Sequence, residues 1–332
     1  MGKRLLVAAL VTGLACLQLP SWAGAEHDEP GYAGLEFYGS SQVSKSELEK
    51  EARLKPGADL KATLKAASRL KEELENRRIQ ANIDVASEQD KLYITVDVME
   101  DGAGASGRKL TAPHHVYLTD ERPLSLLEDM SERAQKLAAE GRTYTRNFQD
   151  GIEFFSDEPL NQLALKLQRC VPPIRNELFQ VIGSDPDPAR RSAAVELLNW
   201  DSNPVRNCYD LTAALEDGSA AVRAKVDRYL LPRLSMLPDN FPIQNLVEAY
   251  SRQLTRPSYV DRAAALQGLL AIVKAHPFAA GAVKVANEDK LQQLVSMSVL
   301  TSIKQPAQQL LEACHHIPEL PKPQKRRQLN EF

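Results

Sequence analysis

A short pattern recurs in the second half of the chain and limits what that half can fold into. Asp185 is followed six residues later by Arg191 and then by a pair of alanines, and the same skeleton returns from Asp217 to Arg223. A weaker copy covers Tyr259–Leu266. Such recurrence is typical of repeats built from helices, because one unit cannot bury its apolar face alone and must stack on the next. Stacked helices form long surfaces for partners, so the pattern predicts binding as the class of function.

These residues resemble a HEAT-type helical repeat. The resemblance implies that the Asp forms a turn that starts a helix, that the Arg links neighbouring repeats, and that the alanines let helices approach closely. We therefore expect structural roles for Asp185, Arg191, Asp217, Arg223 and Arg262. Helices that begin near Pro188, Ser219 and Ser258 are expected in an outer, convex row, and helices that begin near Pro172, Pro204 and Phe241 in an inner, concave row.

The inner row is where HEAT-like proteins commonly hold a ligand. Its candidate partner-binding residues are the polar side chains Arg175, Glu177, Arg206, Asp210, Gln244, Glu248 and Arg252. The alternative is a plain solvated face, since charged side chains are mostly exposed in any protein.

Residues 31–100 have a different rhythm. Leu35–Tyr38 alternates as a strand does, Ser44 and Glu47 form a capping box for a short helix, and Asp59 can cap a second helix. The apolar stripe of that helix is Leu60, Leu64, Ala67, Leu70 and Leu74. Two alternating runs follow, Ala81–Val85 and Leu92–Val98. The predicted order is strand, helix, helix, strand, strand, in a small α+β domain.

This order, with Val43-Ser44 before the first helix and Leu54–Gly57 between the helices, resembles a POTRA domain. The resemblance implies a periplasmic domain that holds client polypeptides by adding a strand to a sheet edge. The implied edge residues are Ile79, Gln80, Ala81, Asn82, Ile83, Asp84 and Val85. The chain departs from the family in having Arg78-Ile79 where Gly-Tyr is usual, and no barrel follows. A generic α+β domain with a protected edge is the alternative.

The remaining segments predict the cellular location and the domain boundaries. Residues 1–25 read as a secretory signal, with Lys3 and Arg4 before an apolar run and a small-residue cleavage site. Three glycines in Asp101–Gly107 predict a flexible linker over 101–122, which allows the two domains to move relative to each other. An all-α HEAT-type solenoid is expected over 123–317 and a disordered basic tail over 318–332. No later segment has the length of a membrane helix.

Composition and motifs narrow the chemistry. A formal net charge of −3 gives no basic face for nucleic acid. No zincin, P-loop, dinucleotide or nucleophile-elbow motif occurs, and the histidine pairs at 114–115 and 315–316 lack a second pair at metal-ligand spacing. We therefore expect no catalysis, no metal and no cofactor. Cys170 and Cys208 lie about one repeat apart, so they form either a disulfide or two buried small hydrophobes.

The function expected from these features is an exported, periplasmic adaptor. Its partner would be a protein, such as an envelope or outer-membrane component, held by the sheet edge and the helical groove. A periplasmic enzyme, or an enzyme regulator that uses the groove, is one alternative. A structural spacer in an envelope complex is another.

Overall fold

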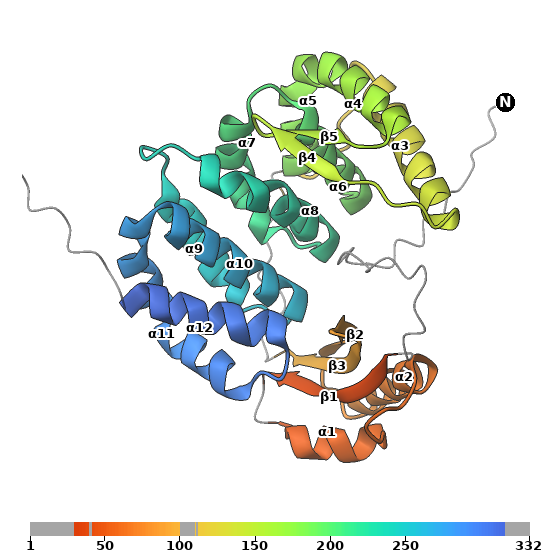
Figure 1. The fold of residues 1–332 in the computed structure, drawn as a ribbon, viewed down its shortest axis with the longest axis vertical. Coiled ribbons are helices and arrows are strands. Elements are labelled where there is room, and N and C mark those ends of the chain that lie inside the picture. Colours follow the sequence, from red (N-terminus) through yellow and green to blue (C-terminus); the bar gives the residue numbers. More distant parts are fainter. Residues whose placement is uncertain (1–29, 40–41, 100–109, 111, 316–332) are drawn as a thin grey trace, which may run out of the picture.

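The computed structural model describes residues 30–39, 42–99, 110 and 112–315 (Figure 1). They form a small α+β sheet region and a largely helical region. The expected signal segment, the glycine-rich part of the linker at 101–109, His316 and the basic tail lie outside the described residues. In Figure 1 the chain follows an arc, with the sheet region at one end and α3 and α4 at the other.

The sheet region has the element order expected from the sequence. Its elements are β1 (Gly31–Tyr38), α1 (Lys45–Ala52), α2 (Leu60–Asn76), β2 (Ala81–Glu88) and β3 (Lys91–Val98). The sheet order is β1-β3-β2, with β3 parallel to β1 and antiparallel to β2. Both expected caps are present: Ser44 forms the capping box with Glu47, and the Asp59 carboxylate accepts from the backbone N–H of Ala62.

The buried face of α2 differs from the predicted stripe. Leu60 and Leu64 are about half exposed, at 48% and 49%, whereas Thr63 and Ala66 are buried. Thr63 can be buried because its hydroxyl donates to the carbonyl of Asp59. The face turned to the sheet therefore passes through Thr63 in the first turn and leaves the two leucines outside.

The helical region consists of helical elements and one hairpin. Its α-helices are α3 (Arg122–Ala139), α4 (Glu158–Cys170), α5 (Arg175–Ser184), α6 (Pro188–Leu197), α7 (Pro204–Leu211), α8 (Ala220–Leu230), α9 (Ile243–Leu254), α10 (Tyr259–Ala275), α11 (Ala280–Met297) and α12 (Thr301–His315). The hairpin of β4 (Arg146–Gln149) and β5 (Ile152–Phe155) corrects the expectation of helix almost throughout. Pro306 lies inside α12.

Helices of the repeated pattern pack in two rows. The second helices of the successive pairs, α6, α8, α10 and α12, contact one another in order, and α9 contacts α11 in the other row. In Figure 1 α7, α9 and α11 follow the outer border of the arc, and α8, α10 and α12 lie on its inner side. This is the reverse of the predicted assignment. The sheet region contacts the starts of α10 and α12 in that inner row.

The second half of the predicted flexible linker is packed on α5 and α6. Val116 and Leu118 are buried in the main core, and the backbone N–H of His114 donates to the carbonyl of Ser184. Arg190 donates to the carbonyl of Val116 at 2.5 Å. The backbone and hydroxyl of Thr119 both donate to Glu177 at 2.7 Å. Residues 112–121 are thus part of the fold, because their backbone groups find partners that the sequence pattern does not reveal.

One glycine pair offers a test of the packing. A Cβ on Gly268 of α10 would lie 2.5 Å from the Tyr250 ring, whereas one on Gly281 of α11 would have no heavy atom within 4 Å. We expect Gly268→Ala to lower the free energy of unfolding by about 1–3 kcal/mol through overpacking. Gly281→Ala should leave it unchanged or raise it by up to about 1 kcal/mol. Urea unfolding checks both, and equal effects of the two substitutions would contradict this packing.

Candidate functional site at the junction of the two regions

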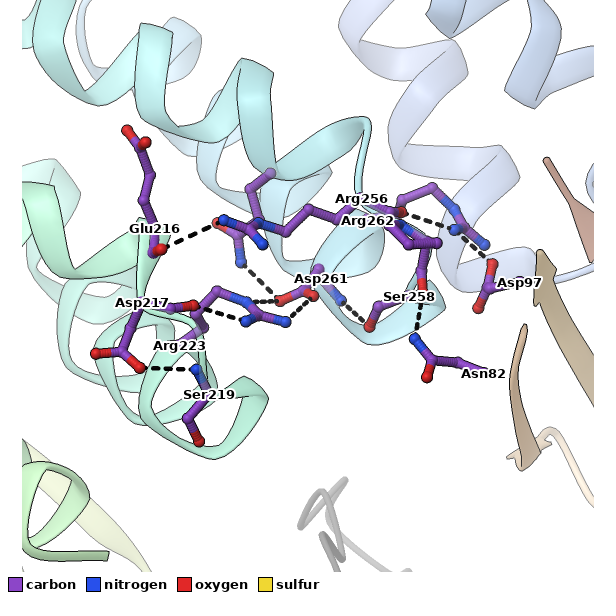
Figure 2. A network of polar contacts seen from close by, with 12 residues as sticks. Asn82, Asp97, Glu216, Asp217, Ser219, Arg223, Arg256, Ser258, Asp261 and Arg262 are labelled. Atoms are coloured by element: carbon purple, nitrogen blue, oxygen red, sulfur yellow. Dashed lines mark hydrogen bonds and ion pairs between the residues drawn. The ribbon is translucent and has the colours of Figure 1, made fainter. Parts of the chain in front are cut away.

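A chain of buried arginine–aspartate contacts runs through the copies of the pattern, and Figure 2 shows the part of it from Asp217 to Asp97. Arg191 donates to the carbonyl of Asp185 at 2.8 Å and makes two bonds, of 2.9 and 2.8 Å, to the carboxylate of Asp217. Arg223 repeats this geometry, with 2.7 Å to the carbonyl of Asp217 and 2.9 and 2.6 Å to Asp261. Each arginine therefore closes its own turn and joins the next repeat. This is the structural role expected from the sequence.

The third copy extends this chain into the sheet region. Arg256 stands where the first two copies have aspartate, and Arg262 donates to its carbonyl at 3.2 Å. The carboxylate that Arg262 reaches is Asp97 of β3, with 2.6 Å between Nη1 and Oδ1. Arg262 is fully buried and Asp97 is 1% exposed. Asp97 thus supplies the carboxylate that comes from the next copy of the pattern in the first two cases.

Carboxylates of the sheet region also bind free backbone N–H groups of the helical region. Asp97 Oδ2 accepts from Tyr259, the first residue of α10, at 2.9 Å. Glu88 accepts from Thr301 and Ser302 at the start of α12, at 2.7 and 3.1 Å, and Glu36 accepts from Val299 at 2.8 Å. The first N–H groups of a helix have no partner within it, and negative charge is favoured there. These contacts join the sheet region to the helical region.

Tyr38 of β1 completes the junction. The guanidinium carbon of Arg262 lies 3.9 Å from the centroid of its ring, and the ammonium of Lys290 on α11 lies 4.7 Å from it. Lys290 also donates to the Tyr38 hydroxyl. Cations are attracted to the faces of aromatic rings, most strongly where water is excluded. One ring thus holds cations from two helices.

A cavity of about 340 Å³ lies at this junction. Its wall on the sheet side includes Glu36, Phe37, Tyr38, Gly39 and Val98. Its wall on the helical side is formed by Thr255, Pro257, Lys290, Gln293, Leu294, Met297 and Ser298. Ligand sites occur preferentially between domains, so this cavity is the candidate ligand site of the molecule.

Burial changes proton affinity at two acids near the junction. It raises the pKa of Asp97 above its usual value, although the Arg262 charge acts in the opposite direction. It raises the pKa of Asp227 to about 8, while the amide of Gln253 donates to that carboxyl group at 2.6 Å. Asp227 is thus mostly protonated at neutral pH.

The predicted edge residues lie on a strand that is at the border of the sheet. No described strand pairs with β2 on the side away from β3. Ile83 and Val85 pack toward the helices α1 and α2, Asp84 is exposed, and Asn82 donates to the carbonyl of Pro257 at 2.6 Å. Of the residues just before the strand, Ile79 is buried and the carbonyl of Gln80 accepts from Met99.

The predicted groove residues are instead engaged with one another and with their neighbours. Arg175 of α5 bonds Asn207 at 2.8 Å and Asp210 at 2.7 Å on α7, and Arg206 also bonds Asp210. Glu177 binds Thr119, Gln244 donates to Glu248, and Arg252 makes bonds of 2.8 and 2.6 Å to Glu216. The Arg175 contacts join α5 to α7, and the Arg252 contacts join α9 to the short helical turn that ends at Glu216. The Arg206–Asp210 and Gln244–Glu248 contacts each lie within one helix.

The disulfide, one of the two expectations for Cys170 and Cys208, is not formed. Cys170 and Cys208 are both free thiols, and Cys208 is fully buried among apolar residues. Burial raises the pKa of the Cys208 thiol to about 12. The alternative expectation, a buried small hydrophobe, describes Cys208.

Sequence reasoning missed the residues that build the junction: Glu36, Tyr38, Glu88, Asp97, Arg262 as an interdomain residue, and Lys290. The sequences of β1 and β3 did contain a pattern that bears on these residues. Glu36 and Tyr38 alternate with apolar residues of β1, and Thr95 and Asp97 do so in β3. Such alternation normally marks a solvated face. Here Glu36, Thr95 and Asp97 are all at most 3% exposed, because the helical region covers that face.

Comparison with protein-family models, curated proteins and solved structures finds no match for this chain. Within the described ranges, no three His, Cys, Asp or Glu side chains gather as a metal site would require. In the same residues no helix is long and apolar enough to cross a membrane.

The Arg262–Asp97 pair should contribute much of the stability of the contact between the sheet region and the helical region. We expect Arg262→Met to lower the free energy of unfolding by about 3–5 kcal/mol, because it leaves a buried carboxylate without its cation. The double variant with Asp97→Asn should be less destabilised than the single one. As a control, Arg206→Met, whose side chain is 65% exposed, should cost at most about 1 kcal/mol. Urea unfolding measures all three, and equal costs for Arg262→Met and Arg206→Met would refute the assignment.

Asp227 should make stability depend on pH. Since its folded-state pKa of about 8 is above the unfolded value near 4, the folded state binds the proton more tightly. The stabilisation is complete below about pH 4 and is lost as pH rises to about 8, by up to about 1.4 kcal/mol per pH unit. In Asp227→Asn this decline should be absent. Unfolding midpoints of variant and parent from pH 5 to 9 test this, and parallel curves would show the assignment to be wrong.

Proposed function

We propose that the protein is an exported, non-catalytic adaptor that binds an extended polypeptide along the edge of β2. The observation that carries the proposal is the state of the two sheet edges. The edge of β1 is covered near its start, where the backbone of Tyr32 exchanges hydrogen bonds of 2.7 and 2.8 Å with Ala58 and Gly57. A register shift follows directly after Tyr32. Both features hinder the pairing of a further strand with that edge.

The edge of β2 has neither feature. Its hairpin turn contains two residues, Gln89 and Asp90, both with positive φ, so Glu88 and Lys91 form the closing hydrogen-bonded pair. Every second residue back along β2 then also faces β3. This leaves the backbone N–H and C=O groups of Ala81, Ile83, Val85 and Ser87 directed outward. A polypeptide added there would form main-chain bonds that tolerate many sequences.

The docking of the sheet region supports this use of the edge. One face of the sheet packs on α1 and α2, and Asn82 and Glu88 on the other face are bound to the helical region. The strand is therefore held at both ends on a rigid base. A rigid edge loses less conformational entropy when a partner strand is added.

Two double variants test the proposal. Ala81→Pro with Ser87→Pro removes two outward N–H groups and leaves the bonds between β2 and β3 intact, as proline in an edge strand allows. The matched control, Ala81→Val with Ser87→Val, keeps both N–H groups. A photo-crosslinking residue at exposed position 84 is added to each, and the crosslinked segments are sequenced from cells.

The parent and the valine variant should crosslink to the same polypeptide segments, and the proline variant should lose at least about tenfold in yield. The loss follows from two hydrogen bonds worth about 1 kcal/mol each. Synthetic copies of the captured segments should then protect the outward amides of β2 from hydrogen exchange. Equal yields in the two variants, or the absence of any crosslinked polypeptide, would rule out the edge as the binding site.

A further inference from the structure

The cavity between the two regions carries two opposite charges that are not paired with each other. Glu36 on β1 is 3% exposed, and its Oε2 accepts from the backbone of Val299. Lys290 on α11 donates to the Tyr38 hydroxyl and lies 3.4 Å from Gln293 Oε1. Among the described residues neither charge has an opposite charge within 4.0 Å. A carboxylate as buried as that of Glu36 normally has a cation beside it.

The other residues that line the cavity restrict the size and polarity of a ligand. Leu294 and Met297 of α11 and Val98 of β3 provide apolar surface, and Tyr38 and Gln293 provide neutral hydrogen-bonding groups. The volume of about 340 Å³ is at the small end of the range for ligand sites. A ligand here must be small and partly apolar, and it must carry both a negative and a positive group.

We propose that this cavity binds a small zwitterion of the amino-acid type with an apolar side chain. Its carboxylate would lie at the Lys290 ammonium, where the Tyr38 hydroxyl can donate a second bond. Its ammonium would lie at Glu36, and its side chain would lie against Leu294 and Met297. Charge-assisted bonds at both ends supply selectivity for the intact zwitterion. The inference does not depend on the β2 edge, which is formed by other residues.

The ligand would touch the sheet region through Glu36 and the helical region through Lys290. Binding would therefore favour the docked arrangement over any state in which the regions separate. A ligand that binds only the docked state raises the unfolding temperature with its concentration. Thermal unfolding thus provides a second measurement besides direct binding.

The test is isothermal titration calorimetry of the full chain with L-leucine and L-methionine. Two blocked analogues serve as probes: N-acetyl-leucine, which lacks the ammonium, and leucinamide, which lacks the carboxylate. We expect the intact amino acids to bind, and each blocked analogue to bind at least about tenfold more weakly, as the loss of one charge-assisted bond implies.

Two variants test which charged group of the ligand binds Glu36 and which binds Lys290. Glu36→Gln keeps an oxygen for the Val299 N–H and should abolish the preference for leucine over N-acetyl-leucine. Lys290→Met should abolish the preference for leucine over leucinamide. The control Lys304→Met, on the exposed face of α12, should retain both preferences. Circular dichroism melting of the unliganded variants shows whether each is folded.

Two results would overturn the proposal. One is the absence of measurable heat and of any rise in unfolding temperature with millimolar leucine or methionine. The other is binding whose preference between leucine and its blocked analogues is the same in the parent, in Glu36→Gln and in Lys290→Met.

Discussion

The buried contact between Arg262 and Asp97 determines how the two regions of this protein are joined. A buried cation without a partner is strongly unfavourable, so Arg262 requires a carboxylate at its side. In the first two copies of the repeated pattern the next repeat supplies it, through Asp217 and Asp261. In the third copy the carboxylate comes from β3, more than 150 residues earlier in the chain. The same interaction thus joins helix to helix and then helix to sheet.

The helix starts add a second constraint of the same kind. The initial N–H groups of α10 and α12 need acceptors, and Asp97 and Glu88 supply them from the sheet region. Asp97 makes both kinds of contact: Oδ1 pairs with the Arg262 cation, and Oδ2 accepts a hydrogen bond from the Tyr259 N–H. Burial would otherwise favour its protonated form, which could satisfy neither contact as well. Neutralising this one side chain therefore weakens both the buried ion pair and the helix start.

Local signals in the sequence predicted the elements of the sheet region and their caps. The capping box at Ser44, the cap at Asp59 and the repeated Arg residues act over a few residues or over one repeat, so their spacing is visible in the chain. The partner of Arg262 was not predictable, because nothing in the spacing links position 262 to position 97. The packed segment 112–121 was missed for a related reason. Its burial depends on Asp185, Arg190 and Glu177, whose side chains could equally have been solvated.

The predicted groove residues show a different limit of prediction from sequence. Helical spacing predicted that Arg175, Arg206 and Asp210 share one row, yet spacing alone could not tell a binding surface from a set of contacts within the fold. The distances decide it, since Arg175 bonds both Asn207 and Asp210 and is only 18% exposed. Charged side chains that are already paired within the chain contribute little to the binding of a partner. Two features of the described residues differ from this: the backbone groups of β2 that point away from β3, and the charges of Glu36 and Lys290, whose hydrogen bonds are to neutral groups.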